Sequence, residues 1–169
     1  MIPRLADQTV HMRVLLKLVL DCEPDDAWRA LQDPAVFASV AGPITAFRSL
    51  EPGGFPDRWM PGEHHVAGRL FGVVPVGEQV IDLAMSEQPG GVRMLKDTGG
   101  AVSGPIAAIT EWEHTMVVSS AGRGRTLYRD RLVFEVGGVS ALAWPVFWAY
   151  WQWRALRLKT LAPTWKYAA

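Results

Sequence analysis

His114 and Asp130 are the two side chains of this sequence whose positions suggest chemistry. In residues 128–134 the even positions are apolar or aromatic apart from Asp130, and both arginines are at odd positions, so the even face of a strand here points inward. In residues 112–118 the even positions are Trp, His, Met and Val, which places His114 on the matching inner face. A carboxylate that faces an apolar interior is costly unless it is hydrogen-bonded or paired. Asp130 therefore needs a partner.

A glycine-rich turn joins these two segments, so we expect them to be antiparallel neighbours. A register that opposes Met116 to Asp130 places His114 one diagonal step from Asp130, within reach of a hydrogen bond. Three roles remain open for Asp130. It can be structural, holding Tyr128, His114, a backbone N–H or Arg154; it can orient a ligand hydroxyl; or it can move a proton together with His114. In that last role His114 is a general acid or base and Asp130 sets its tautomer.

Other catalytic or metal sites are not indicated. His64 and His65 are neighbours in an expected strand and point to opposite faces, so they do not easily bind one metal. The sequence has no phosphate-binding glycine loop, no nucleophile elbow around a serine and no pair of cysteines. We therefore expect neither a metal nor a cofactor.

The elements that position these residues follow from hydrophobic periodicity and from turn residues. We expect strands over residues 12–20, 44–50, 64–74, 77–85, 92–98, 106–119 and 125–136. Two short helices, 24–33 and 35–40, follow the first strand, and a long helix over 140–166 carries Pro145 in its first turn and ends or kinks near Pro163. Short turns make the last six strands one antiparallel meander to which the first strand is added. The fold class is α+β, with a seven-stranded curved antiparallel sheet around the C-terminal helix.

Length, composition and charge limit the number of domains, the kinds of partner and the compartment that we expect for this protein. A chain of 169 residues fits one domain, which we expect to span residues 1–169 with a tail over 1–10. Lysine plus arginine equal aspartate plus glutamate at 17 each, which argues against nucleic acid. Residues 141–156 are too short an apolar stretch to span a membrane. The N-terminus lacks the apolar run of a signal peptide and the single Cys22 cannot form an internal disulfide, so we expect a cytoplasmic protein.

The order of the expected elements resembles the START-related helix-grip (SRPBCC) superfamily. The segments LVLDCEPDDAWRALQDPAVFASV and WEHTMVVSSAGRGRTLYRDRLVF are similar to its bacterial polyketide cyclase/dehydrase-like and uncharacterised ligand-binding members. The resemblance implies that a ligand is gripped between the concave sheet and the long helix. The residues that it implies around the ligand, together with two from the apolar stripe of the helix, are Trp112, His114, Met116, Tyr128, Asp130, Leu132, Phe134, Phe147 and Trp151.

Three functions remain open at this stage. The first is binding of a small hydrophobic molecule, which could be aromatic, polyketide-like or a lipid. The second is an aromatase/cyclase or dehydratase type of enzyme that uses His114 and Asp130. The third is an interaction module, such as a homodimer, formed through the tryptophan-rich C-terminal helix with the cavity filled by side chains. A cavity of roughly 300 Å³ or more is what the first two require.

Overall fold

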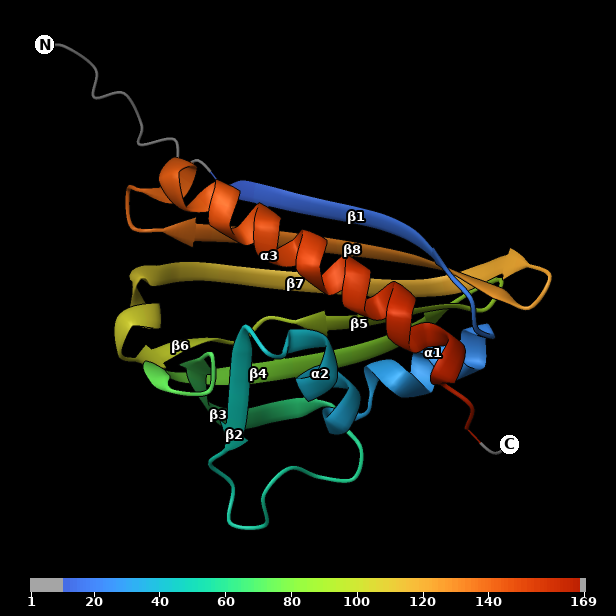
Figure 1. Ribbon diagram of the computed structural model, residues 1–169, viewed down its shortest axis with the longest axis horizontal. Helices are drawn as coiled ribbons and strands as arrows, with labels where there is room; N and C mark the ends of the chain where they lie inside the picture. Colours follow the sequence, from blue (N-terminus) through green and yellow to red (C-terminus); the bar gives the residue numbers. More distant parts are fainter. Residues whose placement is uncertain (1–10, 168–169) are drawn as a thin grey trace, which may run out of the picture.

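A computed structural model describes residues 11–167 of the chain, so the tail expected over residues 1–10 lies outside the described part. One antiparallel sheet has the strand order β1-β8-β7-β5-β4-β3-β2, and β6 pairs with β4 (Figure 1). The strands are β1 Met12–Leu20, β2 Thr45–Ser49, β3 Gly62–Leu70, β4 Val74–Gln88, β5 Val92–Asp97, β6 Gly100–Ser103, β7 Ile109–Gly122 and β8 Arg125–Val136. The expected α+β fold, with a curved antiparallel sheet and a long C-terminal helix, is confirmed.

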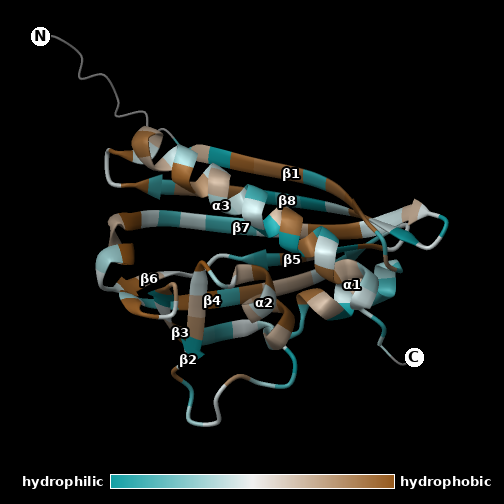
Figure 2. Ribbon diagram, viewed as in Figure 1, coloured by the Kyte–Doolittle hydropathy of each residue, from teal (hydrophilic) through white to brown (hydrophobic). Residues whose placement is uncertain are grey.

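The strands that carry the site alternate between buried and exposed positions. In β1 the side chains of Val14, Leu16, Leu18 and Leu20 are buried, and those between them are exposed. The ribbon of β1 accordingly changes between hydrophobic and hydrophilic colours along its length (Figure 2). Strand β8 repeats this pattern with its even positions buried, as expected for a sheet with one face on the core.

The sheet contains one strand more than expected. Strand β6 approaches β4 at Gly77, where φ is 123° and an added Cβ would lie 1.9 Å from the carbonyl oxygen of Ser103. Glycine at this position therefore permits the close contact between the two backbones. A 3-10 helix, Pro105–Ala108, then leads into β7, which begins three residues later than expected.

The hairpin between β3 and β4 also differs from expectation. The turn falls on residues 71–73, with Phe71 at a φ of 50°, and not at Pro75. Pro75 lies within β4 opposite Arg69, beside a β-bulge. A proline that donates no hydrogen bond is tolerated at such an irregularity, which explains why it does not end the strand.

Three α-helices cover one face of the sheet: α1 Pro24–Leu31, α2 Pro34–Ala41 and α3 Ser140–Leu161. Asp33 separates the two short helices and caps the second, because its Oδ1 accepts a hydrogen bond from the Ala35 N–H at 2.8 Å. Helix α3 runs along β1 and β8 (Figure 1). Pro145 lies inside α3, past its first turn, and the α-helix ends at Leu161, before Pro163. None of the helices within residues 11–167 combines the length and apolarity needed to cross a membrane.

Candidate functional site

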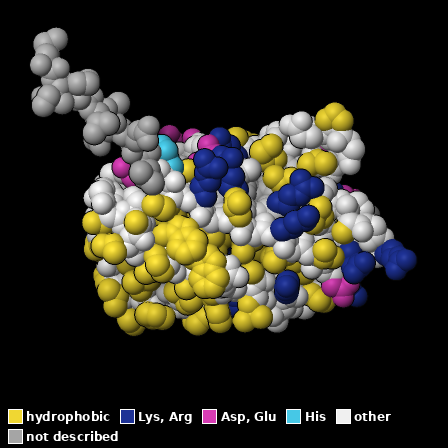
Figure 3. All heavy atoms as spheres, turned by 90° about the horizontal axis from the view of Figure 1, so that it is seen from above, with side chains coloured by type: hydrophobic (Ala, Val, Ile, Leu, Met, Phe, Trp, Pro, Cys, Tyr) yellow, Lys and Arg dark blue, Asp and Glu magenta, His cyan; other side chains and the backbone are white. Residues whose placement is uncertain are grey.

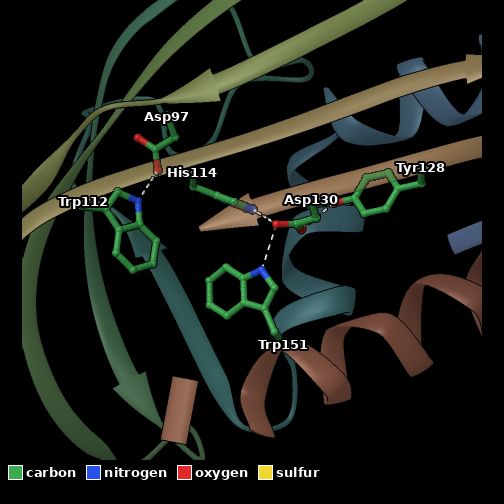
Figure 4. Close-up of polar contacts among 6 residues, drawn as sticks. All are labelled: Asp97, Trp112, His114, Tyr128, Asp130 and Trp151. Atoms are coloured by element: carbon green, nitrogen blue, oxygen red, sulfur yellow. Dashed lines mark hydrogen bonds and ion pairs between the residues drawn. The ribbon is translucent and has the colours of Figure 1, made fainter. Parts of the chain in front are cut away.

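The centre of the site is the carboxylate of Asp130 on β8, which accepts three side-chain hydrogen bonds (Figure 4). Its Oδ1 lies 2.9 Å from His114 Nε2 and 2.8 Å from Trp151 Nε1, and its Oδ2 accepts from the Tyr128 hydroxyl at 2.8 Å. The register that makes this possible, with Met116 opposite Asp130, is the one expected from the sequence. The side chain of Asp130 is 0% exposed, so every one of these donors replaces water.

The three donors and the nearby cations determine the ionisation of this group. Burial opposes ionisation of Asp130, but the charge of His114, its hydrogen bond, the charge of Arg154 and the Trp151 indole outweigh it and lower the pKa of Asp130 to about 2. Burial and the Asp130 charge raise the pKa of the Tyr128 hydroxyl well above its ordinary value. Asp130 is therefore a carboxylate at neutral pH, and Tyr128 remains a protonated donor to it.

His114 is held in one orientation from three sides. Its ring lies 5.3 Å from the ring of Trp151 and 6.3 Å from that of Trp112, and Asp130 binds its Nε2. The hydrogen bond to a carboxylate assigns a proton to Nε2, so the neutral ring carries its lone pair on Nδ1. Nδ1 has no hydrogen-bond partner among residues 11–167. This arrangement suits a group that accepts a proton or a hydrogen bond from a bound molecule.

A second buried carboxylate, Asp97 at the end of β5, lies beside this cluster. Its Oδ1 accepts from the backbone N–H of Asp82 and of Gly99, both at 3.0 Å, and its Oδ2 accepts from Trp112 Nε1 at 3.1 Å. Burial raises the pKa of Asp97, although these donors and the charge of His114 act in the opposite direction. Sequence reasoning missed this residue. Asp97 follows Leu95 by two positions in the expected strand, so the alternation of side chains could have placed it on the same inward face.

An inner cavity of about 130 Å³ lies between the sheet, the short helices and α3. The residues around it are mostly aliphatic and aromatic, namely Ala30, Leu31, Val36, Phe37, Val40, Phe47, Trp59, Gln79, Ile81, Leu83, Leu95, Asp97, Trp112, His114, Met116, Tyr150, Trp151, Arg154 and Leu158. The volume is below the roughly 300 Å³ that ligand binding and catalysis were expected to require, so the inner cavity alone does not meet that expectation. It is close to the roughly 150 Å³ of an engineered apolar cavity that binds benzene. The inner cavity alone therefore has room for about one aromatic ring.

An apolar cleft of about 230 Å³ adjoins the inner cavity near the start of α3. Phe47, Gln79, Trp112 and Tyr150 border both spaces and form the wall between them. Two of these four side chains are held by hydrogen bonds. The Tyr150 hydroxyl and Thr45 Oγ1 are hydrogen-bonded at 2.6 Å, and Trp112 Nε1 donates to Asp97 Oδ2. Movement of this wall would join the two spaces.

The residues expected around a ligand fall into three groups. Trp112, His114, Met116 and Trp151 border the inner cavity. Phe147 borders the cleft. The remaining four, which are Tyr128, Asp130, Leu132 and Phe134, are buried on the same face of β8 but border neither space. Asp130 thus reaches the cavity only through His114 and Trp151, which contact both.

Some cavity residues lie outside the set expected from the sequence. Trp59, in the long connection between β2 and β3, is buried and packs edge-on against Phe37 and Phe55. No periodic pattern surrounds it, so the sequence alone gives no signal. Arg154, which sequence analysis considered only as a partner for Asp130, borders the cavity from α3.

Histidines elsewhere in the described chain do not form a metal site with one another. His64 Nε2 contacts the carbonyl oxygen of Met60 at 2.8 Å, whereas His65 lies 3.9 Å from Glu63. A second grouping, His11, Glu111 and Glu135, places three potential ligand atoms within 4.8 Å of one another. His11 and Glu111 in that group are exposed and already paired with each other at 2.8 Å, so we assign no metal to it.

Comparisons with known proteins identify the fold. No family model and no curated protein matches the sequence. Solved structures do match: a protein from Chromobacterium violaceum (18% identity, TM-score 0.61, 89% of this chain and 96% of that chain) and the Zhui aromatase/cyclase from Streptomyces sp. R1128 (13%, 0.60, 90% and 94%). Norcoclaurine synthase from Thalictrum flavum, solved with dopamine and hydroxybenzaldehyde, matches at 13% identity with a TM-score of 0.62 over 95% of this chain and 91% of that one. At these identities the similarity shows a shared helix-grip fold.

Proposed function

We propose that this protein binds a small, largely apolar molecule in the inner cavity between the sheet and α3. The observation that carries the proposal is an apolar cavity bordered by few polar groups, among them His114 and Asp97 from the sheet and Arg154 from α3. Binding sites for small molecules commonly combine such an apolar lining with a few oriented polar groups. The aromatase/cyclase and the norcoclaurine synthase share only the fold with this chain, and on that basis they support the binding of a ring-containing molecule.

The volumes of the two spaces limit the size of the ligand. One aromatic ring fills the inner cavity of about 130 Å³, whereas a polyketide-like or lipid ligand needs the adjoining cleft of about 230 Å³ as well. That larger ligand would have to displace part of the wall formed by Phe47, Gln79, Trp112 and Tyr150. We therefore place a single ring in the inner cavity and any extension of the ligand in the cleft.

Calorimetric titration with toluene, a neutral single-ring probe, tests the proposal. Met116 borders the cavity from β7, so Met116→Trp fills part of it and is expected to abolish binding. Thr115→Trp is the matched control, because it places the same ring one residue along the strand on the opposite face. Thermal melts establish that both variants fold. Binding of toluene that is equal in the two variants, or absent from the wild type, would contradict a site in this cavity.

A second function, catalysis of the cyclase or dehydratase type, is supported by one specific observation. His114 borders the cavity while its Nε2 is bound to a carboxylate, which is the arrangement of an oriented general base. In that case His114→Ala would abolish turnover and leave the affinity for a neutral ring within a few fold. Asp130→Asn would lower turnover through the orientation of His114. Retained turnover in His114→Ala would show that His114 is not the base, and a wild type without turnover would leave binding as the function.

A homodimer through α3 is a third proposal, supported by the exposed apolar side chains of its first half. Leu142 is 79% exposed, Val146 is 70% exposed and Trp148 is 47% exposed. Hydrophobic side chains gather over the end of the molecule where α3 begins, whereas Lys and Arg lie toward the other end (Figure 3). Light scattering of the wild type and of Leu142→Ser tests it: a dimer that the variant converts to a monomer supports this interface, and a monomeric wild type excludes it.

A further inference from the structure

Arg154 is the least satisfied charged group in the core of the described chain. The residue is 7% exposed, and its Nε is buried without a hydrogen-bond partner. No carboxylate among residues 11–167 lies within the 4.0 Å of an ion pair with it. An arginine is always protonated in proteins, and a buried cation without a close anion is costly. The buried Asp130 carboxylate acts on this charge from beyond 4.0 Å, but no anion contacts the guanidinium directly.

The neighbours of Arg154 hold its side chain without neutralising it at contact distance. Its Cζ lies 5.3 Å from the centre of the Trp151 ring, and the hydroxyls of Tyr150 and Tyr128 interact with the guanidinium. Asp130 acts on it as a charge at more than 4.0 Å, and its three hydrogen bonds come from His114, Trp151 and Tyr128. Aromatic and hydroxyl groups thus fix the guanidinium in place.

Arg154 is one of the residues that border the inner cavity, although its Nε is itself buried. The other ionisable side chains around this cavity are His114, Asp97 and Tyr150, whose hydroxyl is hydrogen-bonded to Thr45. Asp97 already accepts three N–H hydrogen bonds, so its oxygens are not free to pair with Arg154. His114 adds no negative charge in either protonation state. An anion that contacts Arg154 directly can therefore be supplied by a molecule bound in the cavity.

We propose that the ligand of the inner cavity is a monocyclic aromatic carboxylate whose carboxylate binds Arg154. This inference rests on the proposed ligand-binding function and names its chemical class. The planar guanidinium of arginine can bind both oxygens of a carboxylate through its two terminal nitrogens, and Arg154 borders the cavity. The cavity volume of about 130 Å³ accommodates one ring, and the leucines, phenylalanines and tryptophans around it supply its apolar contacts. A neutral ring would fill the same space but leave the charge unpaired.

Benzoate and benzyl alcohol, titrated by calorimetry into the purified full chain, test this assignment. They share the ring and differ in the charge of the head group. We expect benzoate to bind the wild type about 10 to 100 times more tightly, because a hydrogen bond to a charged partner replaces an unpaired donor. The preference is expected to persist in high salt, since a buried pair is screened much less than a surface one.

Arg154→Met removes the charge and keeps the length of the side chain. It is expected to fold, because the Asp130 carboxylate keeps its three side-chain hydrogen bonds when the Arg154 charge is removed. In this variant benzoate should lose its advantage while benzyl alcohol binds as in the wild type. Arg129→Met, which removes an exposed arginine from the outer face of β8, is the matched control and should keep the preference.

The outcomes separate this inference from the proposed function. Equal binding of benzoate and benzyl alcohol to the wild type would overturn the assignment of a carboxylate and leave the cavity as a site for neutral rings. A preference for benzoate that survives Arg154→Met would also overturn it, because the carboxylate of benzoate would then bind to a group other than Arg154. Binding of neither compound to the wild type would overturn the proposed function and the carboxylate together. The comparison of benzoate with benzyl alcohol on the wild type still tests the assignment of a carboxylate if Arg154→Met fails to fold.

Discussion

Tyr128→Phe tests the buried hydrogen-bond cluster with the smallest possible change. Tyr128 is 0% exposed, and its hydroxyl donates to Asp130 Oδ2 at 2.8 Å. Phenylalanine keeps the ring and removes this one donor, which leaves a charged oxygen without a partner inside the protein. Hydrogen bonds to charged groups contribute about 1.5–3 kcal/mol, so the free energy of unfolding should fall by that amount. For a domain of this size the melting temperature should drop by about 2–4 °C for each kcal/mol.

Equilibrium unfolding in urea at neutral pH, followed by circular dichroism, measures this loss. Tyr167→Phe is the matched control, because Tyr167 also donates its hydroxyl to a carboxylate, Asp33 Oδ2, at 3.2 Å but in a half-buried position. Water can replace the lost donor there, so its cost should stay below about 1 kcal/mol. A Tyr128→Phe variant within about 0.5 kcal/mol of the wild type, or no less stable than the control, would refute the account of this cluster.

A double-mutant cycle with Asp130→Asn shows whether the cost belongs to the pair. Asparagine can keep an oxygen toward His114 and Trp151, and its amide meets the Tyr128 hydroxyl, which can turn to accept. Because the two residues are in contact, we expect their stability effects to be non-additive by about 0.5–3 kcal/mol. Additive effects would mean that the Tyr128 hydroxyl contributes through other neighbours.

Three further predictions concern acid stability, cysteine reactivity and the β4–β6 contact. The fold lowers the pKa of Asp130 from 3.8 to about 2, so its contribution to stability is complete above pH 4 and is lost as the pH falls toward 2. Urea midpoints should fall more steeply in acid for the wild type than for Asp130→Asn, in which Glu113 still contributes, and equal slopes would contradict the prediction. Burial raises the pKa of the Cys22 thiol, so a disulfide reagent at pH 8 should modify it slowly in the native protein and rapidly in urea, and equal rates would contradict its burial. Gly77→Ala should lower the unfolding free energy by about 1–3 kcal/mol, because it forces a strained φ and a clash with Ser103, whereas Gly53→Ala in open space should not; equal urea midpoints would refute this.

Period-two alternation predicted the sheet and the position of the polar cluster. The alternation runs from Trp112 to Val118 in β7 and from Thr126 to Phe134 in β8, so the register that joins His114 to Asp130 followed from the sequence. The β-bulge between Ser120 and Gly122 lies beyond these two stretches. The same reasoning missed β6, because four residues beginning with glycine have too short a pattern to be recognised. Its pairing depends on a close backbone approach at Gly77, which is a tertiary contact.

The borders of the cavity were harder to predict than its inner face. Alternation shows that Asp130 points inward, but it does not show that His114 and Trp151 lie between this carboxylate and the cavity. The cavity volume depends on Trp59 and Phe37, which come from a long connection and from a short helix. Packing of these rings is set by tertiary contacts, which the local sequence does not encode.

The measurement that tests the central claim most directly is native mass spectrometry of the protein purified from its own host, followed by denaturing extraction. A small ring-containing compound should accompany the wild type and be absent from Met116→Trp, in which the cavity is partly filled. A compound retained equally by both forms would show that it binds elsewhere. A wild type that carries no compound, and takes up neither toluene nor benzoate when they are added, would contradict a binding cavity between the sheet and α3.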